Sequence, residues 1–146
     1  QQFGGPQFTE FFCVTIHDPN VSPRPTLAAL NAPLFGSQFQ MSLNAPNHPN
    51  EFYAVVMSTT TNTGIQFPGG FTCLDNDFLL QLTLNPNPIF FQNFASVTDA
   101  NGMAAGIAIN FPAVVGLGCV PLHAVAFVVD PFGGITQSND LKLTVK

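Results

Sequence analysis

Charged side chains are scarce in this sequence, and basic ones are nearly absent. Only 8% of the residues are charged, against about 25% in an ordinary soluble domain, and Lys and Arg together number 3. Arg24, Lys142 and Lys146 cannot form a basic patch, which argues against nucleic acid as a partner. A soluble monomer normally carries many more surface charges. The composition therefore favours a protein that covers part of its surface with copies of itself.

Tryptophan and long apolar runs are missing too. There is no Trp and only 1 Tyr, Tyr53, so the sequence lacks the ring that carbohydrate-binding platforms favour for stacking. The longest apolar run, residues 124–129, has the length of a strand and falls far short of the roughly 18 residues of a membrane helix. We therefore expect no membrane-spanning segment.

Cysteine is also rare, and the 3 cysteines, Cys13, Cys73 and Cys119, lie far apart without metal-ligand spacing. In an oxidising compartment one pair can form a disulfide, and one thiol is left over. The chain opens with Gln1 and Gln2, as a mature secreted protein does after removal of its signal peptide. We expect a secreted protein with no cofactor.

Against these absences stand 16 Phe and a hydrophobic content of 46%, which is not the composition of a disordered chain. The clearest pattern lies in residues 95–145. Three apolar or alternating runs are separated by turn signals at 99–102 and 130–134, with Asp at the turn entry and Gly where positive φ is needed. This pattern predicts the closing strands of an antiparallel sandwich, folded back on one another as in a hairpin.

The preceding segments predict further strands. Residues 38–43 alternate, with Phe39, Met41 and Leu43 facing inward, and residues 52–58 are apolar on both faces, as in a central strand. Strands are also predicted at 26–30, 78–84 and 89–97, with a long loop at 59–70. No segment has a helical periodicity long enough to compete. We expect one domain, an all-β antiparallel β-sandwich, Ig-like or jelly-roll-like, of about nine or ten short strands.

Residues 1–17 are predicted to form an amino-terminal arm, ahead of a Pro-rich linker at 18–25 and the sandwich at 26–146. The linker's prolines prevent it from joining a central strand. Two interpretations of the arm stay open: it pairs as the first strand of its own sandwich, or it leaves the subunit and completes a neighbour's sheet. Its expected interface residues are Phe3, Phe8, Phe11, Phe12, Val14 and Ile16.

Five short motifs within residues 26–146 resemble a known family. Leu27–Gly36 matches p-L-x-x-x-x-a-P-x-x-G, Thr98–Ala104 matches t-D-x-x-G-x-A, and Asp130–Leu141 matches D-P-x-g-g-x-x-x-S-N-x-L. Gln38–Pro46 and Cys73-Leu74 are similar to f-x-l-x-l-x-x-a-P and C-x-L, each with one intervening residue fewer. Together they resemble the secreted β-sandwich domains of planctomycete-type bacterial surface proteins. The resemblance implies a structural or adhesive role at the cell surface, without catalytic residues.

That family usually has a second cysteine near the amino end, and Cys13 would fill this role. The resemblance thus implies a disulfide between Cys13 and Cys73, whereas Cys119 departs from the pattern. Two forms of the bond stay open, one within the chain and one from Cys13 to a neighbouring subunit.

Some polar residues allow chemical alternatives. Asp75 and Asp77, and the turn at Asp99, offer oxygen ligands of the kind that Ca²⁺ prefers. Neither is a full EF-hand loop, and Asx-rich turns commonly cap their own backbone, so we expect no metal site. His123 and Asp99 could join a serine in a hydrolase triad, but the Gly-x-Ser-x-Gly motif is missing. His123 lies in an apolar strand, which favours a structural histidine with one satisfied nitrogen.

The sequence favours a non-enzymatic, secreted structural protein that assembles with copies of itself into a fibre or surface layer. The alternative is a carbohydrate-binding or adhesion module at the cell surface, with a surface glycan as its partner. A hydrolase is the third hypothesis.

Overall fold

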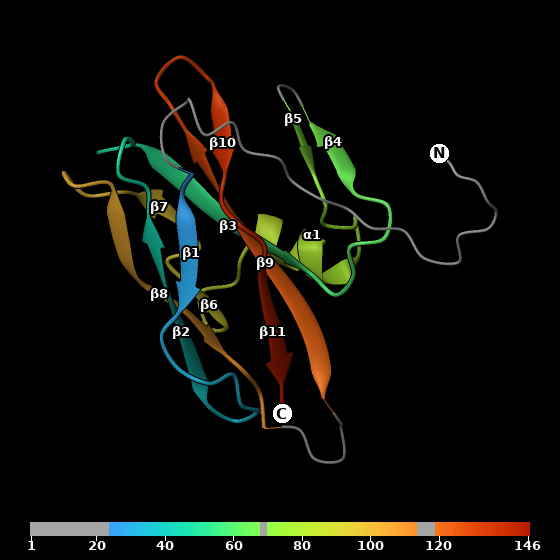
Figure 1. The fold of residues 1–146 in the computed structure, drawn as a ribbon. Helices are drawn as coiled ribbons and strands as arrows, with labels where there is room; N and C mark the ends of the chain where they lie inside the picture. The colour runs from blue at the N-terminus through green and yellow to red at the C-terminus, as the bar shows by residue number, and fades with distance from the viewer. Residues whose placement is uncertain (1–23, 68–69, 114–118) are drawn as a thin grey trace.

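The computed structural model describes residues 24–67, 70–113 and 119–146, which form two packed antiparallel sheets, a separate two-stranded hairpin and one short helix (Figure 1). The predicted arm, with Cys13 and its expected interface residues Phe3, Phe8, Phe11, Phe12, Val14 and Ile16, lies outside the described residues. The disulfide partner of Cys73, the arm's contacts and the boundaries at residues 17 and 25 therefore stay predictions.

The first sheet has the strand order β1-β2-β8-β6, and every pairing in it is antiparallel. Its strands are β1 (Thr26–Ala29), β2 (Gln38–Asn44), β8 (Met103–Asn110) and β6 (Phe91–Gln92). The second sheet has the order β10-β9-β3-β7, and β11 also pairs with β9. Its strands are β10 (Ile135–Gln137), β9 (Val120–Val129), β3 (Phe52–Ser58), β7 (Ala95–Val97) and β11 (Leu141–Val145).

The core lies between the two sheets and follows the alternation of the strands. Phe39, Met41 and Leu43 of β2 are fully buried, as predicted, and they pack into one cluster with residues of β3, β8 and β9. β3 lies between β9 and β7, which confirms the prediction of a central strand at 52–58. The predicted fold class, an all-β antiparallel sandwich, is therefore confirmed, with eleven strands among the described residues.

β3 and β9 carry a second, smaller apolar layer on the face that points away from this core. Val56 and Val125 are buried there with Leu74 and Leu80. The layer is covered by α1 (Phe78–Leu84) and by a hairpin of β4 (Ile65–Phe67) and β5 (Gly70–Thr72). In Figure 1 this hairpin and α1 stand on the right of the sandwich. The apolar character of both faces of β3 is thus explained by two layers of cover.

The two long edges of the sandwich, one at β1 and one at β3, are covered in different ways. On the β1 edge, the Asn139 side chain accepts from the Leu27 N–H at 2.8 Å and donates to the Leu27 carbonyl at 3.1 Å, as a neighbouring strand would. On the β3 edge, Thr83 of α1 accepts from the Met57 N–H at 3.1 Å, so a short helix covers the strand. The candidate site lies on this second edge.

Three predicted elements were wrong. Residues 78–84 form α1 and not a strand, the expected loop at 59–70 contains β4, and the expected single strand at 89–97 is divided between β6 and β7, which belong to different sheets. Asn93, with φ of 55°, turns the chain between them.

The two predicted turns are present, but only one makes a hairpin. The turn at 130–134 joins β9 to its partner β10. The turn at 99–102 carries the chain from β7 to β8, across the sandwich, and so does not close a hairpin. Gly102 has φ of 78°, and a Cβ there would lie 2.0 Å from the Ala45 carbonyl oxygen, which explains the need for glycine.

Candidate functional site

An open apolar surface of the described residues lies where β3 ends before its neighbour β9 does. Ser58, the last residue of β3, pairs with His123, whereas β9 starts three residues earlier at Val120. The Val120–Leu122 end of β9 pairs with β11 on one side, and no described strand pairs with it on the other. The space that a longer β3 would fill is occupied in part by α1.

Two adjoining hollows, of about 360 and 410 Å³, lie between α1 and the two sheets. Both are lined by Leu79 and Leu82 of α1, by Leu122 of β9 and by Phe111 just after β8. We call the two hollows together the α1 groove. Because its lining is almost wholly apolar, the groove suits apolar side chains better than a charged ligand or a reacting centre.

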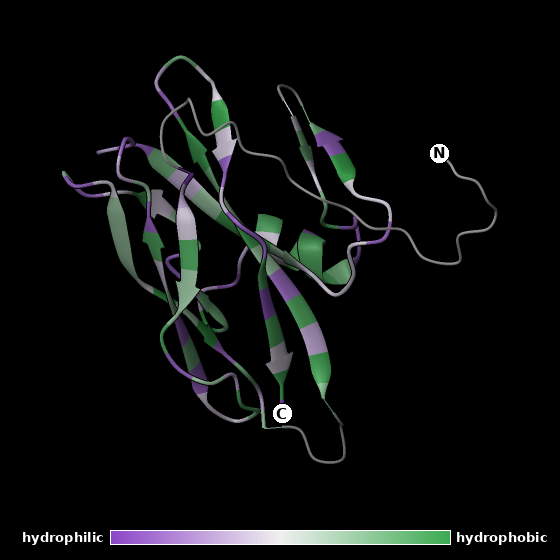
Figure 2. Cartoon of the chain, viewed as in Figure 1, coloured by the Kyte–Doolittle hydropathy of each residue, from purple (hydrophilic) through white to green (hydrophobic). Residues whose placement is uncertain are grey.

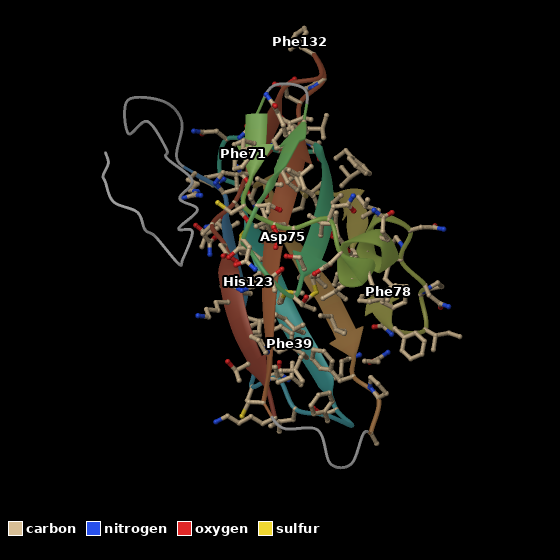
Figure 3. All side chains as sticks on the ribbon, turned by 90° about the vertical axis from the view of Figure 1, so that its right-hand side faces the viewer. Phe39, Phe71, Asp75, Phe78, His123 and Phe132 are labelled. Carbon is tan, nitrogen blue, oxygen red and sulfur yellow. The ribbon has the colours of Figure 1, made fainter. Side chains whose placement is uncertain are left out.

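Large apolar side chains surround the α1 groove and face solvent. Phe78 is 79% exposed and Leu82 40% exposed on one face of α1, and Ile89 and Phe90 are 68% and 43% exposed on the segment that follows. Phe78, Leu82 and Phe90 also line the groove. We call Phe78, Leu82, Ile89 and Phe90 the apolar flank. Figure 2 shows α1 mostly in the colour of apolar residues, and Figure 3 places Phe78 on this side.

The helix that builds this flank starts because Asp77 caps it. The Asp77 carboxylate accepts from the Leu80 N–H at 2.9 Å, and its other oxygen accepts from the Thr59 N–H and hydroxyl, each at 2.7 Å. Burial raises the pKa of Asp77, but these hydrogen bonds outweigh burial and hold the pKa below its ordinary value. Asp77 therefore fixes α1 to the end of β3.

Asp75 organises the loop opposite. Its carboxylate accepts from the backbone N–H groups of Asn62, Thr63 and Gly64, at 2.9, 2.7 and 2.9 Å, and from the hydroxyls of Thr60 and Thr63. Burial raises the pKa of Asp75, and the hydrogen bonds, that of Thr60 first, hold it well below its usual range. Donor hydrogens point at both carboxylates of the 75–77 segment, so the structure favours backbone capping over calcium binding here.

The turn aspartates behave in the same way. Asp99 accepts from the N–H groups of Asn101 and Met103 at 2.8 and 2.9 Å, and Asp130 accepts from those of Phe132 and Gly134 at 2.8 and 2.9 Å. Among the described residues, no group of three or more His, Cys, Asp or Glu side chains is placed to hold a metal ion.

The two described histidines each meet one carboxylate. His123 Nδ1 lies 3.1 Å from Asp140 Oδ2, so its partner is Asp140. The triad hypothesis required Asp99 as the partner of His123. His48 Nδ1 lies 2.9 Å from Glu51 Oε1, and its buried Nε2 has no hydrogen-bond partner among the described residues. One ring nitrogen of His123 thus has a partner, as the sequence predicted, and its structural role stays a prediction. The sequence gave no signal for the His48 pair.

Three of the exposed aromatic rings among the described residues lie apart from one another. Tyr53 is buried, its hydroxyl donates to the Asn93 carbonyl at 2.8 Å, and burial raises its pKa. Phe71, Phe78 and Phe132 are exposed, but they stand on β5, on α1 and on the turn after β9, at separate places in Figure 3. This arrangement gives the glycan-binding alternative no flat stacking surface among these residues.

The sulfur atoms of the two described cysteines differ in state. Cys73, just after β5, is disulfide-bonded, and Cys119 is an exposed free thiol. The predicted partner, Cys13, lies outside the described residues, so the pairing stays a prediction. A disulfide is typical of a protein that matures in an oxidising compartment.

Fold and site together define a β-sandwich with an open apolar flank. A scan of protein-family models and a search of curated proteins found no match to the chain. The resemblance to planctomycete-type surface domains therefore stays a prediction. Among the described residues, no helix has the length and apolar character needed to cross a membrane.

Proposed function

We propose that this chain is a secreted structural subunit that assembles with copies of itself, in a fibre or surface layer, and has no enzymatic activity. The observation that carries the proposal is the apolar flank, where Phe78 on α1 and Ile89 on the segment that follows it are 79% and 68% exposed. Contiguous exposed apolar side chains mark interaction surfaces, since water disfavours them. The covering partner that we propose is a second copy of the chain.

Composition supports a self-association partner. The chain has a net charge of −5 with only 3 basic residues, so an acidic partner has little to bind. A copy of the same chain brings apolar side chains of the same kind. A contact between two different surfaces of the chain does not close and builds a filament, whereas a two-fold contact closes a dimer.

The arm supplies the second proposed contact. We propose that residues 1–17 leave the sandwich and dock on a neighbouring subunit, with Phe3, Phe8, Phe11, Phe12, Val14 and Ile16 as the buried positions. Strand edges that few charges protect, as in this chain, favour such additions. The disulfide at Cys73 supports a secreted protein.

The flank is tested by paired substitutions at exposed residues. Phe78→Ser with Ile89→Ser should leave the fold intact, since both side chains face solvent, and should weaken self-association by about a hundredfold or more, because each buried side chain contributes about 1.5–3 kcal/mol. Phe132→Ser is the matched control, as Phe132 is 97% exposed but lies outside the flank. Sedimentation velocity and electron microscopy measure the assemblies.

Unchanged assembly of the double variant would remove the flank from the interface. Deletion of residues 1–17 tests the arm separately, and we expect it to shorten or abolish the polymers. A chain that stays monomeric when concentrated, with or without those residues, would refute the whole proposal.

A further inference from the structure

A further apolar hollow, separate from the α1 groove, lies on the opposite side of α1. It has a volume of about 280 Å³ and lies between the outer face of the second sheet, the β4–β5 hairpin and α1. Its walls include Val56, Phe67, Leu80, Phe127, Val129 and Ile135. We call it the hairpin pocket. Because its lining has no charged residue, its occupant must offer apolar side chains.

The side chain of Arg24, the first described residue, contacts the end of β10, whose first residue, Ile135, lines this pocket. The Arg24 guanidinium donates to the Ser138 carbonyl at 3.3 Å, one residue beyond the end of β10. The neighbouring Gln137 pairs with Phe127, a pocket wall, and its side chain donates to the Phe71 carbonyl of β5 at 2.7 Å. Arg24, to which the preceding segment is joined, is thus anchored to the residue that follows β10.

Cys73 marks the opposite border. Thr72, the last residue of β5, lines the pocket, and the disulfide-bonded Cys73 follows it directly. If Cys13 is its partner, as the sequence predicts, the arm is attached next to the hairpin. Arg24 follows Cys13 by 11 residues, which span at most about 36 Å when extended. The segment between Cys13 and Arg24 would then join these two borders of the pocket.

The residues around Cys13 have the chemistry that the pocket requires. Residues 8–17 contain three Phe, one Val and one Ile, and Glu10 is their only acidic residue. With a period of two, Phe11 falls on the same face of an extended chain as Cys13, and Phe12 and Val14 fall on the other. Either face can therefore present an apolar side chain beside the disulfide.

We propose that the hairpin pocket is the docking site of residues 8–17 of this chain, held there by the disulfide to Cys73. The arm lies across the β4–β5 hairpin, and a phenylalanine next to Cys13 fills the pocket. This inference rests on the proposed function in one respect, namely whether the arm comes from the same chain or from a neighbouring copy. An exchanged arm makes the same contacts between chains that it makes within one chain.

The site is tested in the full, oxidised chain with a photoreactive benzoylphenylalanine at position 12, and in a second protein at position 11. We expect cross-links from at least one of these positions to the peptides of β4 and β5 and to the 127–135 segment, mapped by mass spectrometry. The same probe at position 3, remote from Cys13, is the control and should give much weaker cross-links there. Cross-links to the Phe111 and Leu122 peptides, which line only the α1 groove, would overturn the proposal, as would equal labelling from all three positions.

A second measurement keeps the test independent of the probe. Ile135→Lys places a charge on a half-buried pocket wall, and we expect it to abolish the cross-link and to speed proteolysis between residues 1 and 17 at least tenfold. Val97→Lys, at an exposed position of the β7 edge, is the control and should change neither. If Ile135→Lys leaves both readouts unchanged, the arm docks elsewhere.

Isotope-mixed samples separate this inference from the proposed function. Cross-links at the pocket within a single chain support the docking site and contradict arm exchange. Cross-links at the pocket between differently labelled chains support both. Loss of polymers in the flank variants with retention of the pocket cross-link shows that flank and arm act separately.

Discussion

Asp75 and Asp77 are two residues apart, yet they organise two different segments of backbone. Asp75 gathers the N–H groups of the 62–64 turn, and Asp77 caps α1 and bonds Thr59. An acidic pair in a sequence can indicate either a cation site or backbone capping. Here N–H and O–H groups surround both carboxylates and favour backbone capping. Their hydrogens carry partial positive charge at the positions where a cation would have to bind.

Acid should weaken the contribution of Asp75. Its folded-state pKa lies below the unfolded value of about 3.9, so its stabilisation is fully present above that pH and is lost as the pH falls through and below it. We expect Asp75→Asn to lower the free energy of unfolding at pH 7 by about 1 kcal/mol, a figure reduced for partial exposure. Urea unfolding at pH 7 and at about pH 3 should show this difference shrinking in acid. A difference that is independent of pH would contradict the assigned role.

The cap of α1 can be tested without changing its packing. Asp77→Ala removes the acceptor of the Leu80 N–H and should destabilise the fold by about 1–2 kcal/mol. Asp77→Asn keeps an acceptor at this position and should cost less than half as much. Equal losses for the two variants in denaturant titrations would show that charge, and not capping, is what Asp77 contributes.

At the scale of elements, the strands whose sequence alternates between apolar and polar residues were predictable. Elements whose conformation depends on tertiary contacts were not. β2 alternates in sequence, and its Phe39, Met41 and Leu43 are buried as expected. Residues 78–84 read F-L-L-Q-L-T-L, which suits a strand as well as a short helix. Asp77 as N-cap and Thr83 as the acceptor for Met57 favour the helix, and the second contact is invisible before the fold is known.

Thr83 should be the residue that joins α1 to the sheet. Its buried hydroxyl accepts from the Met57 N–H and donates to the Leu80 carbonyl at 3.0 Å. Thr83→Val leaves the Met57 N–H buried without a partner and should cost about 1–3 kcal/mol. Thr144→Val, at an exposed position of β11, is the matched control and should stay within about 0.5 kcal/mol. Chemical denaturation measures the free energy of unfolding of both variants. An equal decrease in the two variants, or a decrease in the control alone, would refute this role of Thr83.

At the scale of the whole molecule, the sandwich was predictable and its apolar flank was not. Composition alone indicated a covered surface, but the sequence pointed to the arm as the interface. The flank depends on α1, which was expected to be a strand, and on Ile89 and Phe90, which were expected inside one long strand. Both segments are placed by tertiary contacts, of β6 with β8 and of α1 with β3, which no local pattern specifies.

The central claim is that the apolar flank is covered by another copy of the chain. Sedimentation velocity of the native, oxidised full-length chain over a wide range of concentration tests it most directly. The account predicts species larger than the monomer that grow with concentration and disappear when Phe78 and Ile89 are both serine. A single monomeric species at every concentration, with the unsubstituted flank, would contradict it.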